Sequence, residues 1–371
     1  MRPIVKTALR RLWRDHTTLQ FGVRPERALL LRGVGDRAAR LIAAIDGTRD
    51  QQALRATAAQ LGLEPAFADR LLALLIDARV VDDAATSPAA LAALPIAERD
   101  RLAPDLASIS LLAPGTDGGL ATLELRRRAK VAVVGAGRVG APVAALLAAA
   151  GVGHVVVTDD GGCAPSDCAP GGVSIGQLGV SRITAAAAVI RRASASTRVD
   201  PIEAPERPDL VVLAPREGAA EPQIGDRLLR ADRPHLLVGV RETTAVIGPL
   251  VVPGESACLR CLDLRRSDRD PGWPLIAAQL AAAPPRAPAP ACDVVLASLA
   301  ASVAALQALA WLDAGATAID AAATRTPLPA TFDGTLEITL PDWRIRRRPW
   351  SRHPACGCHW AQERPADSAT G

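Results

Sequence analysis

Residues 130–160 read KVAVVGAGRVGAPVAALLAAAGVGHVVVTDD, and this stretch decides the fold. A short valine-rich run suits a buried parallel strand. It leads into the pattern Gly-x-Gly-x-x-Gly at Gly135, Gly137 and Gly140, and an Ala/Leu-rich segment of strong helix formers follows. A second valine-rich strand ends in Asp159 and Asp160. The order of strand, glycine loop, helix, strand and acid predicts a nucleotide-binding, Rossmann-like unit.

Each glycine of this loop has a predicted role. Gly135 permits a tight turn, Gly137 lets the backbone approach a phosphate, and Gly140 lets the helix pack closely against the strand. The helix N-terminus offers free N–H groups and a partial positive charge to an anion. The pattern leaves the identity of the nucleotide open.

The composition of the 371-residue chain allows roughly two domains. The formal net charge of +4 is spread along the chain, so binding to nucleic acid is not indicated. The first residues lack the long apolar core of a signal peptide, and we expect a soluble, cytoplasmic protein without membrane contact. The apolar, uncharged segment Val294–Leu312 is predicted as a deep core helix or as half of a subunit interface.

Four segments are predicted. Residues 1–83 form a small winged-helix-like domain, and residues 84–128 form a linker with connecting helices. Residues 129–360 form the Rossmann-like domain, and residues 361–371 form a disordered tail. The helices predicted in the first segment are Asp36–Ile45, Asp50–Leu61 and Ala66–Arg79, and a strand is predicted at Ala28–Leu31.

Three functions remain open for the small domain. A DNA-reading helix would be basic, whereas Arg70 and Arg79 on the third helix are offset by Asp69 and Asp77. An edge strand beside a helix is a ready groove for a peptide that adds as a further strand. A dimerisation or packing module without a ligand fits the same features.

Alternating strands and helices continue to about Val252 and predict a mainly parallel sheet with helices on both faces. The predicted elements are helices at Ser181–Arg192 and Gln223–Ala231 and strands at Arg198–Glu203, Asp209–Leu213 and His235–Val240. Residues 265–291 are rich in Arg, Asp, Pro and Ala, and Pro284–Pro290 in particular is predicted as a mobile crossover loop. Thr335–Arg348 is predicted as a hairpin.

Two close cysteine pairs, Cys258/Cys261 and Cys356/Cys358, lie far apart in the sequence. Together they predict a structural four-cysteine zinc site that holds the C-terminal hairpin to the core. A redox Cys-x-x-Cys pair or free thiols are the alternatives. A redox pair usually stands at the head of a helix, whereas Cys258 follows a Pro-Gly turn.

The second cysteine pair is the less regular half of the zinc site. Because only one residue separates Cys356 from Cys358, His353 or His359 is a possible substitute for one thiolate. The remaining cysteines, Cys163, Cys168 and Cys292, have no obvious partner in the sequence.

The glycine loop, the acidic strand end and the later Cys-Leu-Arg-Cys resemble the ubiquitin-activating-like ThiF/MoeB/HesA superfamily over about residues 125–360. The resemblance implies a homodimer that adenylates the C-terminal carboxylate of a small protein or peptide with ATP and magnesium. It also implies a zinc ion on four cysteines. The family's second pair is usually Cys-x-x-Cys, so the Cys356-Gly-Cys358 spacing is a departure.

Carried over by position, the resemblance implies a nucleotide site that has lost part of its chemistry. Asp159 matches the acid that holds the ribose hydroxyls, and Arg182 replaces a family lysine. Pro170 stands where the family has a phosphate-clamping arginine, and Pro215-Arg216 stands where it has its magnesium aspartate. Adenylation needs this metal and these cations to neutralise the triphosphate.

A winged-helix-like module ahead of such a domain resembles the partner proteins of YcaO-type cyclodehydratases. The resemblance implies that the leader of a ribosomal precursor peptide adds as a strand beside Ala28–Leu31, against the helix Ala66–Arg79. The implied contact residues are Leu29, Leu31, Phe67, Leu71 and Leu74.

The leading hypothesis is therefore a zinc-stabilised, homodimeric scaffold that binds a precursor peptide for a YcaO-type enzyme. An active adenylyltransferase, with Arg182 and the acids Asp159, Asp160 and Asp167 around ATP, is the alternative. An NAD(P)-dependent oxidoreductase is disfavoured, because a chain without tyrosine has no catalytic Tyr-Lys pair.

Overall fold

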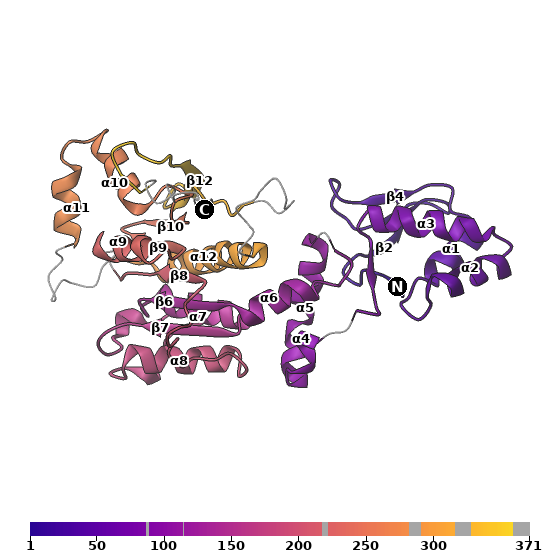
Figure 1. Ribbon diagram of the computed structural model, residues 1–371, viewed down its shortest axis with the longest axis horizontal. Helices are drawn as coiled ribbons and strands as arrows, with labels where there is room; N and C mark the ends of the chain where they lie inside the picture. Colours follow the sequence, from indigo (N-terminus) through magenta and orange to yellow (C-terminus); the bar gives the residue numbers. More distant parts are fainter. Residues whose placement is uncertain (87–88, 114, 217–221, 282–290, 316–327, 359–371) are drawn as a thin grey trace, which may run out of the picture. The chain divides into compact units, whose positions relative to one another are not determined.

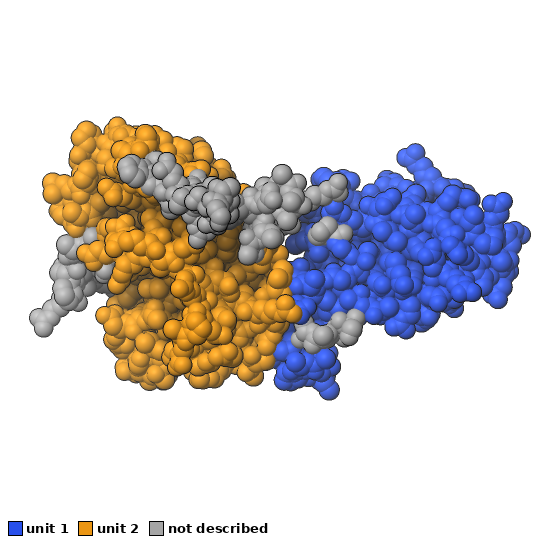
Figure 2. All heavy atoms as spheres, viewed as in Figure 1, with its two compact units in different colours: residues 1–124 blue, residues 125–371 orange. Residues whose placement is uncertain are grey.

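The computed structural model describes residues 1–86, 89–113, 115–216, 222–281, 291–315 and 328–358. They form two compact units, residues 1–124 (unit 1) and residues 125–371 (unit 2), which Figure 2 shows in different colours. The predicted tail, residues 361–371, lies outside the described residues.

Unit 1 begins with short strands and continues with three helices (Figure 1). β2 (Arg11–Trp13), β3 (Leu19–Phe21) and β4 (Leu29–Leu31) form an antiparallel sheet in which β4 is an edge strand. α1 (Asp36–Ala43), α2 (Gln51–Gln60) and α3 (Pro65–Asp77) confirm the three predicted helices, and β1 (Pro3–Val5) pairs with β5 (Val81–Asp83). Residues at the N-termini of α2 and α3 favour these helices. The Asp50 carboxylate caps α2, and Pro65 is the first residue of α3.

The segment predicted as a linker is largely helical and packs into unit 1. It contains α4 (Ala89–Ala92), α5 (Ile96–Leu112) and α6 (Leu120–Arg128), and unit 1 ends at Glu124 within α6. Pro104 lies inside helix α5 without ending it.

A buried ion pair ties α5 to the strands of unit 1. Lys6 is 2% exposed, and its ammonium lies 2.9 Å from Asp82 Oδ1. Ser110, on α5, donates its hydroxyl to Asp82 Oδ2 over 2.7 Å. Because a buried charge is costly unless it is paired, this triad holds α5 in one position on the unit.

Unit 2 is built on a seven-stranded sheet with the order β12-β11-β10-β9-β8-β6-β7 (Figure 1). Its parallel half confirms the predicted Rossmann-like core and consists of β6 (Lys130–Val134), β7 (His154–Thr158), β8 (Leu210–Leu213) and β9 (His235–Arg241). The antiparallel half consists of β10 (Thr244–Val251), β11 (Gly334–Thr339) and β12 (Arg344–Pro349), of which the last two are the predicted hairpin.

Helices cover both faces of this sheet, as predicted. α7 (Gly140–Ala149), α8 (Arg182–Ala193) and α12 (Val294–Ala314) share the main hydrophobic core on one face. α9 (Pro222–Arg230) and the start of α10 (Leu259–Ser267) pack on the other. By length and composition α12 would suit a membrane span, but half of its most apolar window is buried in unit 2, as in the core helix of a folded domain.

Two segments of unit 2 differ from the predictions. Only Arg198 of the predicted strand Arg198–Glu203 forms a bridge, with His154, because Pro201 and the prolines that follow do not support a ladder. Residues 265–291, for which no helix was predicted, contain the end of α10 and the whole of α11 (Trp273–Ala281), and the predicted loop Pro284–Pro290 lies outside the described residues. Ion pairs between residues one turn apart, such as Asp263–Arg266, stabilise α10. The charged residues that form them are the reason why the helix was not predicted from the sequence.

His235 should make the stability of unit 2 sensitive to acid. It is fully buried at the start of β9, Nδ1 donates to the Arg233 carbonyl, and Nε2 has no hydrogen-bond partner among the described residues. Burial lowers its pKa from 6.5 to about 4. In this window the unfolded chain binds the proton and the folded chain does not, so stability falls as the pH falls.

We therefore expect unfolding to require about 2 kcal/mol less at pH 5 than at pH 7 on account of His235. Urea unfolding of the wild type and of His235→Leu at both pH values measures this contribution, because the other titrating groups are common to the two proteins. An equal loss of stability in both proteins would contradict the assignment.

Candidate functional site

The glycine loop connects β6 to α7 with no room for side chains at its two ends. Gly135 has a φ of 101°, and a Cβ there would overlap with the Ala214 carbonyl. A Cβ at Gly140 would overlap with the Gly135 carbonyl. The turn and the close helix packing therefore both need glycine.

Gly137 is the middle glycine of the loop. The group nearest to the place of a Cβ there is the Arg216 side chain, at 3.3 Å. The part of the loop that was predicted to approach a phosphate thus lies beside a guanidinium.

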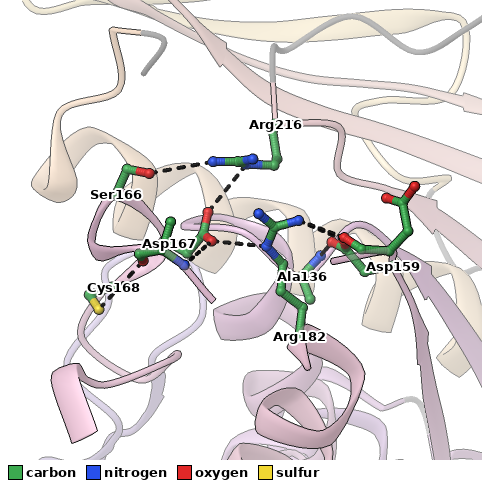
Figure 3. A network of polar contacts seen from close by, with 9 residues as sticks. Ala136, Asp159, Ser166, Asp167, Cys168, Arg182 and Arg216 are labelled. Atoms are coloured by element: carbon green, nitrogen blue, oxygen red, sulfur yellow. Dashed lines mark hydrogen bonds and ion pairs between the residues drawn. The ribbon is translucent and has the colours of Figure 1, made fainter. Parts of the chain in front are cut away.

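Asp159 lies beside this loop at the end of β7, and both of its oxygens have partners (Figure 3). Oδ2 accepts the Ala136 N–H over 2.6 Å, and Oδ1 accepts from Arg182 over 3.0 Å. The acid predicted to hold ribose hydroxyls is therefore bound within the protein.

Arg182 joins Asp159 to a second buried carboxylate, Asp167. Arg182 Nε donates to Asp167 Oδ2 over 2.9 Å, and both side chains are almost fully buried. Burial lowers the pKa of a guanidinium, but the hydrogen bonds to Asp167 and Asp159 outweigh it and raise the pKa of Arg182 above its usual value. Arg182 is therefore a permanent cation shared by two acids.

Arg216 completes the network from the loop after β8. Its Nε lies 3.2 Å from Asp167 Oδ1, and its Nη2 donates to Ser166 Oγ over 3.4 Å (Figure 3). This residue stands where the resemblance places a magnesium aspartate. The position therefore holds a cation paired with Asp167 rather than a carboxylate free for a metal.

A small cavity remains between the glycine loop and Arg216. Its volume is about 110 Å³, below the ~300–1,000 Å³ of typical small-molecule sites. Its lining includes Gly137, Arg138, Ser166, Asp167, Arg216 and Cys292. Arg138 donates to the Cys292 carbonyl over 2.7 Å. Neither Arg138 nor Ser166 was predicted from the sequence as a site residue, although Arg138 lies within the glycine loop.

Pro170 lies in a different place. It lines an apolar cavity of about 340 Å³ formed with residues of α7, α8 and α12. The position at which the resemblance expects a phosphate-clamping arginine thus contributes apolar surface.

The four cysteines predicted as metal ligands come together at the head of α10. Their sulfur atoms all lie within 4.8 Å of one another. Cys258 Sγ is 3.5 Å from Cys356 Sγ, and Cys261 Sγ is 3.5 Å from Cys358 Sγ. Four sulfurs at about 2.3 Å from a tetrahedral metal would be about 3.8 Å apart, so the cluster fits a closed metal site.

The premise used against a redox pair was wrong, because Cys258 is the N-cap of α10 and so does stand at a helix head. The geometry nevertheless disfavours a redox pair, because the Cys258 and Cys261 sulfurs lie as near to the second cysteine pair as to each other. A hydrogen bond from the Cys258 thiol lowers the pKa of Cys261, which favours the thiolate form that binds a metal ion.

His353 supports the cluster from outside. Its Nε2 lies 3.1 Å from Asp268 Oδ2, its Nδ1 accepts the Ala355 N–H, and its own backbone N–H donates to Cys261 Sγ. Both ring nitrogens are thus engaged, and His353 does not replace a cysteine. The other candidate, His359, lies outside the described residues.

The remaining cysteines are separate from this cluster. Cys163 is buried with Ala141, Val173 and Ala185, and Cys168 is partly buried nearby in the chain. Burial raises the pKa of Cys292, which disfavours the thiolate that a nucleophile requires.

The predicted peptide-contact residues of unit 1 lie on β4 and α3. Leu29 and Leu31 on β4, and Phe67 and Leu71 on α3, are partly buried against the same core. Leu74, one turn further along α3, is 45% exposed. We call these five residues of the edge strand β4 and of α3 the β4–α3 strip.

The fold and these sites define the class of protein. The sequence pattern of the ThiF family matches residues 115–358, and the chain belongs to this family. A search of curated proteins found no match.

Several solved structures share the fold over both units. Escherichia coli MccB bound to MccA-N7isoASN matches with 15% identity and a TM-score of 0.66, over 96% of this chain and 99% of that one. The same enzyme with ATP gives a TM-score of 0.67 at 15% identity over the same shares of the two chains. PaaA matches with 17% identity and a TM-score of 0.65, over 94% of this chain and 100% of that one.

The cysteine cluster predicts that the purified chain holds about one tetrahedrally bound metal ion. Cys258→Ser should lose this ion, because three thiolates no longer close the site, whereas Cys163→Ser should keep it. Elemental analysis of the two variants and the wild type, after dialysis, measures the content. A wild type without metal, or equal contents in the two variants, would contradict the site.

Proposed function

We propose that this chain is a scaffold that binds the leader of a ribosomally made precursor peptide and presents the peptide to a modifying enzyme of the YcaO type. The observation that carries the proposal is the unpaired edge of β4, together with the apolar residues of the β4–α3 strip. The likeness of both units to MccB supports it, because that protein was solved with N-formylated MccA.

The strip suits a peptide in extended conformation. β4 pairs with β3 on one side only among the described strands, so its other edge offers backbone N–H and C=O groups. Leu29 and Leu31 alternate along β4, and Phe67, Leu71 and Leu74 repeat at helical spacing on α3. A peptide strand would gain hydrogen bonds from the edge and burial from the leucines.

The ion-paired nucleotide site supports a role without adenylation. Magnesium catalysis of adenylate transfer needs a carboxylate for the metal and free cations for the phosphates. Here Asp167 is held between Arg182 and Arg216, and Arg182 also holds Asp159. A nucleotide would have to break these ion pairs, of which those of Arg182 are buried, before Asp159 or Asp167 could hold a ribose or a metal ion.

The remaining parts of the proposal concern assembly and location. We propose a structural zinc ion on Cys258, Cys261, Cys356 and Cys358, because zinc prefers four thiolates in closed sites. We also propose a cytoplasmic homodimer, in which the exposed apolar residues Val295 and Leu306 of α12 are covered.

A second function, ATP-dependent adenylation of a peptide C-terminus, is favoured by one observation. The glycine loop retains the steric features of a phosphate loop at Gly135 and Gly140. In this case Arg182 would turn from Asp159 and Asp167 towards the phosphates, and the released acids, with Asp160, would hold magnesium.

Leu74→Asp should weaken leader binding about tenfold or more, ~1.4 kcal/mol, because a carboxylate would be desolvated in the strip. Leu112→Asp changes an exposed leucine of α5 and should bind as the wild type does. Fluorescence polarisation with labelled leader peptides encoded by neighbouring genes measures both. Failure of every such leader to bind the wild type would reject the proposal.

ATP–pyrophosphate exchange separates the two functions. With each candidate peptide the wild type should give no exchange above that of an Arg182→Ala variant, since the metal acid is absent. Peptide-dependent exchange that disappears in Asp167→Asn would instead establish the adenylyltransferase.

A further inference from the structure

The sheet of unit 1 differs in charge from the rest of that unit. Residues 10–32, which span β2, β3 and β4, contain six arginines and only two acids, Asp15 and Glu26. Residues 33–124 contain eight basic and thirteen acidic residues. The arginine-rich composition of the chain therefore does not account for this basic segment, which lies on the element that carries the β4 edge.

Among the described residues, the two acids form a single, loose ion pair with these six arginines. The Asp15 carboxylate accepts the N–H groups of Thr17 and Thr18 in its own turn, and these bonds lower its pKa to about 2. Glu26 approaches Arg24 to 3.7 Å, with both side chains 71% exposed. Arg27 and Arg32 have no ion-pair partner among the residues that the structure describes, and both are exposed.

Arg27 and Arg32 lie at opposite ends of β4. Arg27 precedes the strand Leu29–Leu31 and Arg32 follows it directly. Helix α3 carries the exposed Arg70, whose contact with Glu64 is a loose 3.8 Å.

The acidic residues of α3 do little to offset the positive charge of these arginines. Asp69 is engaged by Arg55 over 2.9 Å and by Gln51. Asp77, at the end of α3, is an opposing charge on that helix. The surroundings of the strip are therefore predominantly cationic.

We propose that the peptide recognised by this strip is acidic, with apolar residues at alternate positions and Asp or Glu about five positions apart, facing Arg27 and Arg32. This inference rests on the proposed peptide binding and specifies its chemical class. The apolar residues supply burial against Leu29 and Leu74. The acidic ones fix register and accelerate association, which is what complementary charges at the rim of an interface contribute.

A selection from a displayed library of random 20-residue peptides on the full-length chain tests this inference. Peptides recovered on the wild type but not on Leu74→Asp define binding to the strip. These peptides should be rich in Asp and Glu relative to the library. The enrichment should disappear on Arg27→Gln/Arg32→Gln and persist on Arg37→Gln/Arg40→Gln, which removes two exposed arginines of α1.

A synthetic copy of one selected acidic peptide gives the affinity. It should bind Arg27→Gln/Arg32→Gln about tenfold more weakly than the wild type at low salt, and the difference should shrink in high salt as the pairs are screened. Binders that depend on Leu74 but carry no acidic excess would overturn this inference and leave peptide binding standing. A selection without any binder that depends on Leu74 would overturn both.

Discussion

Close packing of the backbone around the glycine loop is the constraint on which unit 2 depends. Carbonyl groups of Ala214 and Gly135 occupy the space that side chains would need at Gly135 and Gly140. Helix α7 can therefore begin directly after the turn that follows β6, and β8 can pair with β6 in parallel register. These are requirements of the fold, and they persist whether or not a nucleotide binds.

The chemistry at this loop depends on charge, which varies independently of that packing. Arg182 and Arg216 surround Asp167, and Arg182 also holds Asp159, so positive and negative groups satisfy one another inside the protein. The network occupies positions that the ThiF resemblance assigns to the ribose and magnesium. A chain of this family can thus keep its phosphate loop while its polar groups stabilise the unit.

Unit 1 combines a rigid base with an open edge. The Lys6–Asp82–Ser110 triad secures α5 to the base through buried charge, whereas β4 and Leu74 remain accessible. A recognition module benefits from this division, because a fixed groove loses little conformational entropy when a peptide binds.

The sequence alone determined the Rossmann-like order, the helices of unit 1 and the two cysteine pairs, because these depend on local periodicity, glycine positions and short spacings. It concealed α5 beyond Pro104 and the helices within residues 259–281, where proline or charged residues obscured the apolar pattern. Only the tertiary structure decided that Cys258 heads a helix, that His353 faces Asp268, and that Arg182 binds two acids. Such pairings join residues distant in sequence or across loops, and the direction of a side chain there is set by packing rather than by its neighbours in the chain.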